Sequence, residues 1–254
     1  MTRLRTGCTV LLLLAGLSLP AFAEESDSKA APRKRAEIHT ELGSNYFALR
    51  DFAVALEEAK EAVNSDSDYA PAHNLLGLIF MELGDHNQAE KAFERAVSID
   101  SSDSDVMTNY GWFLCQRGRF DDGIKHLIEA LKNPLYSTPE KNWYNAGICA
   151  RRKGAEEQAE EYFMKALRLR PELSPAMFFL AEIYFKRGNI GLARTYFTRF
   201  MGDITAPSAE NLWLGVRIER RFGDREGESR YGSLLRRNFP ESKEAVALRN
   251  GQYE

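Results

Sequence analysis

The stretch YGWFLCQRGRFDDG, residues 110–123, decides the fold of this 254-residue chain. It reads as a helix, yet it places Gly111 between two large aromatic residues. A glycine inside a helix costs roughly 1 kcal/mol relative to alanine, so helix propensity does not account for it. A recurrence of the same small residue at a fixed spacing would indicate that packing requires it.

A small residue does recur, with a period of 34 residues and one interval of 36. The two-residue insertion falls in NPLYSTPE, residues 133–140, which its prolines mark as a loop. A second small residue follows the first by twelve positions. Large apolar residues usually lie three and sixteen positions after the first small residue. The six small residues that define the units are Gly43, Gly77, Gly111, Gly147, Ala181 and Gly215.

This pattern resembles the tetratricopeptide repeat, in which each unit is a pair of antiparallel helices, A and B. A single unit cannot bury its own apolar stripe, so the units stack. We predict an all-α fold, a right-handed superhelix of about six helix-turn-helix units over residues 36–254. Small residues lie where helix A crosses helix B, so the packing at Gly111 offsets its low helix propensity.

The N-terminal 23 residues have the three parts of a secretory signal peptide. Two arginines precede an apolar run within residues 9–20, and the sequence Ala-Phe-Ala ends at Ala23. The apolar run is shorter than the roughly 20 residues that a membrane-spanning helix needs. We therefore predict cleavage after Ala23 and export of the chain. Residues 24–35 are polar and charged, and we predict a flexible linker there.

The composition and motifs exclude several classes of function. The formal net charge is −3, which gives no basic surface for nucleic acid. No cluster of His, Cys and Asp has the spacing of metal ligands, and there is no phosphate-binding glycine loop or nucleophile elbow. We therefore predict a protein that is not an enzyme, with no catalytic residue, metal, cofactor or small-molecule substrate.

Helix A of each unit lines the concave groove in such arrays, so we expect function there. The residues that the repeat register places in the groove are mostly apolar and aromatic, and contiguous apolar surface usually marks an interaction site. The register continues through Glu182 in unit five to Val216 and Glu219 in unit six. An extended peptide or amphipathic helix could occupy the groove, or its residues could instead pack as ordinary core. The predicted partner contacts are Leu78, Met81, Trp112, Tyr144, Ile148, Phe178 and Phe185.

The chain has three cysteines, and Cys8 leaves with the signal peptide. Cys115 and Cys149 lie at nearly matching heights on helices A of units three and four. In an oxidising compartment such a pair is expected to bond, so we predict a disulfide between them. The alternative is two buried free thiols.

Three segments resemble the PilW/PilF family of type IV pilus biogenesis proteins. They are NYGWFLCQRGRFDDGIKHL at 109–127, NPLYSTPEKNWYNAGICARRKGAEEQAEEYFMKALRL at 133–169, and LWLGVRIERRFGDREGESRYGSLLRRNFPESKE at 212–244. The resemblance spans about residues 36–245. It implies a pilotin: an adaptor at the inner face of the outer membrane that binds the pilus secretin subunit, helps it assemble, and supports pilus stability.

One departure from that family concerns the membrane anchor. Family members are typically lipoproteins whose signal peptide ends in a Leu-x-Gly-Cys-like lipobox. Here Leu17 follows Gly16, and Cys8 lacks a preceding apolar run. We therefore expect a soluble periplasmic protein, or one whose membrane association is indirect and made through a partner. A periplasmic tetratricopeptide scaffold for cell-wall or envelope enzymes is the alternative function.

Overall fold

The computed structural model of the protein describes residues 22–253. Residues 1–21 of the predicted signal peptide therefore lie outside the described residues. The described chain is helical throughout, with no strand between these limits. None of its helices is both long enough and apolar enough to cross a membrane.

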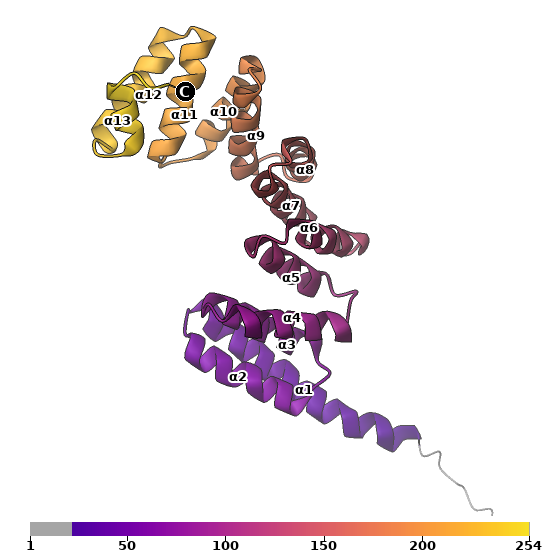
Figure 1. The fold of residues 1–254 in the computed structure, drawn as a ribbon. Helices are drawn as coiled ribbons and strands as arrows, with labels where there is room; N and C mark the ends of the chain where they lie inside the picture. The colour runs from indigo at the N-terminus through magenta and orange to yellow at the C-terminus, as the bar shows by residue number, and fades with distance from the viewer. Residues whose placement is uncertain (1–21, 254) are drawn as a thin grey trace, which may run out of the picture.

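The helices follow one another as six antiparallel hairpins and a short final helix, and Figure 1 shows the hairpins stacked in chain order. This arrangement confirms the all-α superhelix of about six units that the repeat predicted. Their bounds are α1 Phe22–Ala48, α2 Phe52–Ser65, α3 Ala70–Glu82, α4 His86–Ile99, α5 Ser104–Gln116, α6 Phe120–Glu129, η1 Ala130–Lys132, α7 Pro139–Lys153, α8 Glu156–Leu169, α9 Ser174–Lys186, α10 Ile190–Asp203, α11 Ala209–Phe222, α12 Arg225–Asn238 and α13 Lys243–Arg249.

The turns from helix A to helix B repeat one local solution. Gly154 and Gly223 end α7 and α11 with φ of 86° and 91°, a left-handed conformation that glycine adopts without strain. In units one, two and six the residue directly before helix B caps that helix. The side chains of Asp51, Asp85 and Asp224 accept hydrogen bonds from backbone N–H groups at the start of α2, α4 and α12. These short turns fix the antiparallel hairpin before any packing between units.

The glycines in helix A make room for the side chains of helix B. A Cβ atom added to Gly147 would lie 2.5 Å from Cε1 of Phe163, and one added to Gly77 would lie 2.6 Å from Cε1 of Phe93. Both phenylalanines are fully buried. In these units the ring therefore lies directly against the glycine backbone, as the small-residue register predicted.

Unit three uses its glycines differently, because Leu127 replaces the phenylalanine. A Cβ atom on Gly111 would lie 2.9 Å from the carbonyl oxygen of Gly123 and 3.0 Å from the backbone nitrogen of Leu127. The backbones of α5 and α6 thus approach each other directly. This contact explains why a glycine is kept in the middle of α5.

Helix α1 runs through residues 24–35, where the sequence predicted a flexible linker. Arg33 stabilises this end of the helix: its Nε lies 2.6 Å from Oδ2 of Asp66, and its guanidinium lies 4.9 Å from the ring centre of Tyr69. Ala36 is fully buried one turn later. The helix in this segment is supported by Arg33, which finds partners at the turn between α2 and α3.

The insertion between units three and four is held by a polar cluster. The Tyr136 and Thr108 hydroxyl oxygens lie 3.1 Å apart, and Nδ2 of the buried Asn142 donates to the carbonyl of Leu127 at 3.1 Å. These contacts tie the loop to α5, α6 and α7. The two additional residues therefore interrupt the period without separating the two units.

Cys115 on α5 and Cys149 on α7 lie next to the same junction. Both are fully buried, and their Cα atoms are 5.6 Å apart. Disulfides usually join Cα atoms between 4.4 and 6.8 Å apart, so the pair has the geometry that the predicted bond requires.

We predict that Gly111→Ala lowers the free energy of unfolding. The methyl group would meet backbone atoms that cannot rotate away, and overpacking of this kind costs about 1–3 kcal/mol. The better helix propensity of alanine offsets at most about 1 kcal/mol. Urea denaturation followed by circular dichroism measures the change. Gly191→Ala is the matched control, because an added Cβ at Gly191 in α10 meets nothing within 4 Å. Equal effects of the two substitutions would contradict the packing explanation.

We predict that protein lacking residues 1–23, unfolded without a reducing agent, shows no reactive thiol in a labelling experiment followed by mass spectrometry. Two labelled thiols would mean that the cysteines are free. The cysteines are 34 residues apart, and closing a loop of this size contributes about 3–4 kcal/mol in the chain-entropy model. Reduction should therefore lower the unfolding free energy by that amount. In the double variant Cys115→Ala, Cys149→Ala, reduction should have no effect.

Candidate functional site on the face of the A helices

The odd-numbered helices of successive hairpins form a continuous face. Backbone contacts join α1 to α3, α3 to α5, α5 to α7, and α9 to α11, and an ion pair between Arg151 and Glu182 joins α7 to α9. The elements that lie closest together in a curved stack are on its inner side. The inner face is therefore built from α3, α5, α7, α9 and α11, which is where the sequence placed the partner-binding residues.

Five of the seven predicted contact residues are partly exposed on this face. They come from three successive A helices, so one strip of apolar side chains runs across units two to four. We call it the apolar strip, and it consists of Leu78, Met81, Trp112, Tyr144 and Ile148. Each packs against the core with part of its side chain and keeps the rest accessible, as a contact residue must.

Phe178 and Phe185 differ from the prediction, because both rings are buried. Phe178 is 8% exposed, and its ring centre lies 5.1 Å from that of Phe200 on α10. Phe185 is 5% exposed and lies beneath two arginines. Phe178 therefore belongs to the core of unit five, whereas the Phe185 ring is covered by arginine side chains of α11.

The repeat register also fails in unit six. Val216 and Glu219, which it placed in the groove, are buried. Nε of Arg194 pairs with Oε2 of Glu219 at 2.8 Å, which balances the buried charge. Burial raises the pKa of Glu219, and Arg194 opposes that shift. Arg217 and Arg221 occupy the inner face instead.

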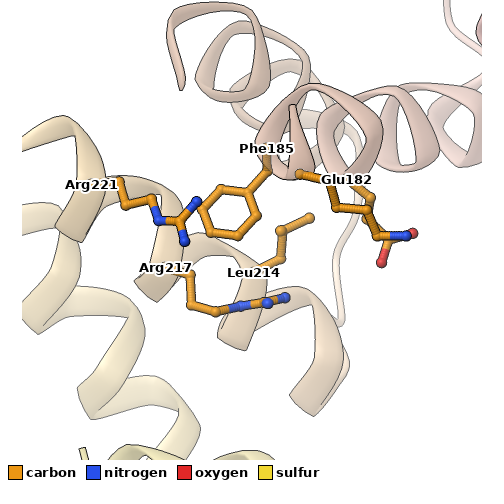
Figure 2. Close-up of a pocket in the computed structure, with 6 residues that line it drawn as sticks. Glu182, Phe185, Leu214, Arg217 and Arg221 are labelled. Atoms are coloured by element: carbon orange, nitrogen blue, oxygen red, sulfur yellow. The ribbon is translucent and has the colours of Figure 1, made fainter. Parts of the chain in front are cut away.

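These two arginines line a pocket of about 320 Å³ between α9 and α11. The guanidinium carbon of Arg217 lies 5.0 Å from the ring centre of Phe185, and that of Arg221 lies 4.5 Å from it. Figure 2 shows both guanidinium groups beside the ring, with Glu182 on the α9 side. We call this the arginine pocket, lined by Glu182, Phe185, Lys186, Leu214, Arg217 and Arg221.

Glu182 connects the arginine pocket to the apolar strip. Its Oε2 lies 2.8 Å from a terminal nitrogen of Arg151 on α7, and the Arg151 guanidinium lies 4.8 Å from the ring centre of Phe179. Burial raises the pKa of Glu182, while the positive charge of Arg151 lowers it. The ion pair therefore joins units four and five where the apolar strip ends.

Arg217 is the least satisfied charged group of the face. Its Nε is buried and has no hydrogen-bond partner among the described residues, and burial lowers the pKa of its guanidinium. Sequence reasoning missed this residue because it applied the register of earlier units to unit six. The run VRIERR, with arginines at 217 and 221 one helical turn apart, was the available signal.

The described part of the chain contains no group of three His, Cys, Asp or Glu residues that could hold a metal ion. The inner face offers apolar surface in units two to four and guanidinium groups in units five and six. Both are chemistries of recognition, suited to a polypeptide that carries apolar and acidic side chains.

Comparisons with known proteins agree with this architecture. Models of the tetratricopeptide repeat match residues 40–104 and 140–173. The chain is 28% identical over 238 residues to the type IV pilus assembly protein PilF of Pseudomonas aeruginosa, covering 92% of this chain and 94% of that protein.

Two solved structures extend the similarity to three dimensions. The crystal structure of PilW, described as a widely conserved type IV pilus biogenesis factor, has a TM-score of 0.75 at 30% identity, with 84% of this chain and 97% of that chain covered. The Pseudomonas aeruginosa PilF structure has a TM-score of 0.81 at 27% identity, covering 87% of this chain and 99% of that one. The match therefore extends over nearly the whole length of both proteins.

We predict that Phe178→Ala and Trp112→Ala affect stability differently. Removing the buried Phe178 ring should lower the free energy of unfolding by about 3–5 kcal/mol, because it leaves a cavity. Trp112 is partly exposed, and its removal should cost clearly less. Urea titrations compare the two variants. A loss at Trp112 as large as that at Phe178 would assign Trp112 to the core and remove it from the apolar strip.

Proposed function

Because this chain belongs to the PilF/PilW family of tetratricopeptide-repeat proteins, we propose that it is a non-enzymatic, protein-binding adaptor of type IV pilus biogenesis. In this role it works in the periplasm, binds a subunit of the outer-membrane secretin, assists secretin assembly and contributes to pilus stability. The observation that carries the proposal is the similarity to PilF over 92% of this chain, together with the match to the PilW structure.

The apolar strip is the proposed contact surface. Trp112 and Tyr144 provide large, rigid side chains on adjacent A helices, the residue types that often dominate binding energy. The strip crosses three units, so a bound segment would touch several hairpins at once. An extended segment or an amphipathic helix of the partner can both supply the matching apolar side chains.

The sequence and the cysteines support the proposed location. The predicted N-terminal signal for export would deliver the chain to the periplasm, where Cys115 and Cys149 can oxidise. The apolar run of the signal lacks a following cysteine, so we propose that any contact with the outer membrane is indirect. The partner then brings the protein to the inner face of that membrane.

The function is tested by deleting the gene and measuring secretin multimers by gel electrophoresis of cell envelopes and piliation by electron microscopy. We predict that the deletion strain accumulates secretin monomers and loses pili. Normal multimers together with normal piliation would contradict the proposal.

Complementation tests the apolar strip separately. The double variant Trp112→Ala, Tyr144→Ala should fail to restore secretin multimers while remaining folded. Trp143→Ala is the matched control, because Trp143 lies on α7 but packs against Tyr162 and Lys165 of α8. Affinity capture from periplasm identifies the partner. Recovery of cell-wall enzymes without secretin would favour the alternative role as a scaffold for envelope enzymes.

A further inference from the structure

The arginine pocket offers a second kind of contact on the inner face. Three of its residues carry positive charge and one carries negative charge. Glu182 pairs with Arg151 of the neighbouring unit and Lys186 pairs with Glu156, so the charges of Arg217 and Arg221 are left over. The pocket therefore has an excess of positive charge. It lies beyond the apolar strip, toward the C-terminal end of the stack.

Neither Arg217 nor Arg221 lies within ion-pair distance of a carboxylate among the described residues. Burial lowers the pKa of Arg217, and the charges of Glu182 and Glu210 raise it only from farther away. Arg194 on the neighbouring α10 provides the contrast, because it pairs with Glu219 at 2.8 Å and with Asp224 at 2.7 Å. A buried guanidinium nitrogen without a hydrogen-bond acceptor, as at Nε of Arg217, is costly for the folded protein. A ligand cannot reach this buried atom, so it would accept hydrogen bonds from the terminal nitrogens of the guanidinium groups that line the pocket.

Aromatic rings hold the two arginines in place before any ligand arrives. Both guanidinium groups lie over Phe185, and Arg217 also lies 5.7 Å from the ring centre of Trp213. Such contacts limit the rotamers of arginine and leave the edges of its guanidinium free to donate hydrogen bonds. Two planar donors of this kind match the oxygens of a carboxylate group.

We propose that the arginine pocket binds the carboxylate of an aspartate or glutamate side chain in an extended partner segment that also contacts the apolar strip. This inference rests on the proposed function in one respect, namely that the chain binds a polypeptide on its inner face. It adds the chemistry of the partner: apolar residues for units two to four, followed by an acidic residue for units five and six.

The inner face favours a side-chain carboxylate over the carboxylate at the end of a chain. The face runs from the apolar strip past Arg151 and Glu182 to the pocket, so a segment lying along it would bring its side chains to the pocket. The volume of about 320 Å³ accommodates a side chain entering from such a segment. A chain terminus is not needed to reach the guanidinium groups.

A displayed library of short random peptides tests the proposal against the full chain from residue 24 onward. Each peptide is fused to its carrier at both ends, so that only side chains can supply a carboxylate. We expect selected peptides to be enriched in Asp and Glu over Asn and Gln at one position beside apolar residues. The double variant Arg217→Gln, Arg221→Gln should lose that enrichment. Arg168→Gln should keep it, because Arg168 is an exposed arginine on α8, a B helix.

Affinity measurements complete the test with one selected peptide and its Glu→Gln version. The change should weaken binding to the wild-type chain about tenfold and leave binding to the double variant unaltered. Circular dichroism checks that each variant is folded. If the double variant does not fold, Arg221→Gln alone replaces it, since Arg221 is exposed.

Several results would overturn the proposal. These are an absence of binding peptides, equal selection of acidic and amide residues, and acidic enrichment that survives in the double variant. Enrichment only in a second library with free carboxyl ends would assign the pocket to a chain terminus. The result is separable from the pilus role: acidic selection with normal pili in the deletion strain would support the pocket and contradict the proposed function.

Discussion

The structure depends on the close approach of two helices within each hairpin. Where helix A carries a glycine, a side chain or the backbone of helix B occupies the space of the missing Cβ. At Gly147 and Gly77 that space holds a phenylalanine ring, and at Gly111 it holds backbone atoms of α6. The two helices of each hairpin can then approach each other closely in the same way, although their side chains differ between units. A regular stack, and with it a continuous inner face, requires this uniformity.

The junction of units three and four is where the period changes, and several interactions converge there. Two cysteines with Cα atoms 5.6 Å apart lie on its inner helices, and the polar contacts of Thr108, Tyr136 and Asn142 hold the inserted loop. Trp112 and Tyr144 are on the same two helices as the cysteines. A bond between the cysteines would fix the relative position of these aromatic side chains and thereby limit the entropy lost when a partner binds.

The inner face divides into two chemistries at the ion pair of Arg151 and Glu182. On one side, apolar side chains remain partly exposed, and on the other, arginines cover an aromatic ring. A purely apolar groove would accept many amphipathic segments. Adding a cationic pocket at a fixed position along the stack selects those that carry an acid at the matching place, because covering the guanidinium groups with a neutral segment would leave their charge without a counter-charge.

The sequence by itself determined the helical hairpins, their number, the role of Gly111, and five partly exposed residues of the apolar strip, because these follow from a period that helix geometry imposes on every unit. Only the tertiary structure decided that Phe178 is core, that Glu219 is buried against Arg194, and that Arg217 and Arg221 form a pocket over Phe185. The helical character of residues 24–35 was also missed. The reason is the same in each case: side chains from neighbouring helices or from a distant turn decide which residues are covered, and the repeat period does not specify those partners.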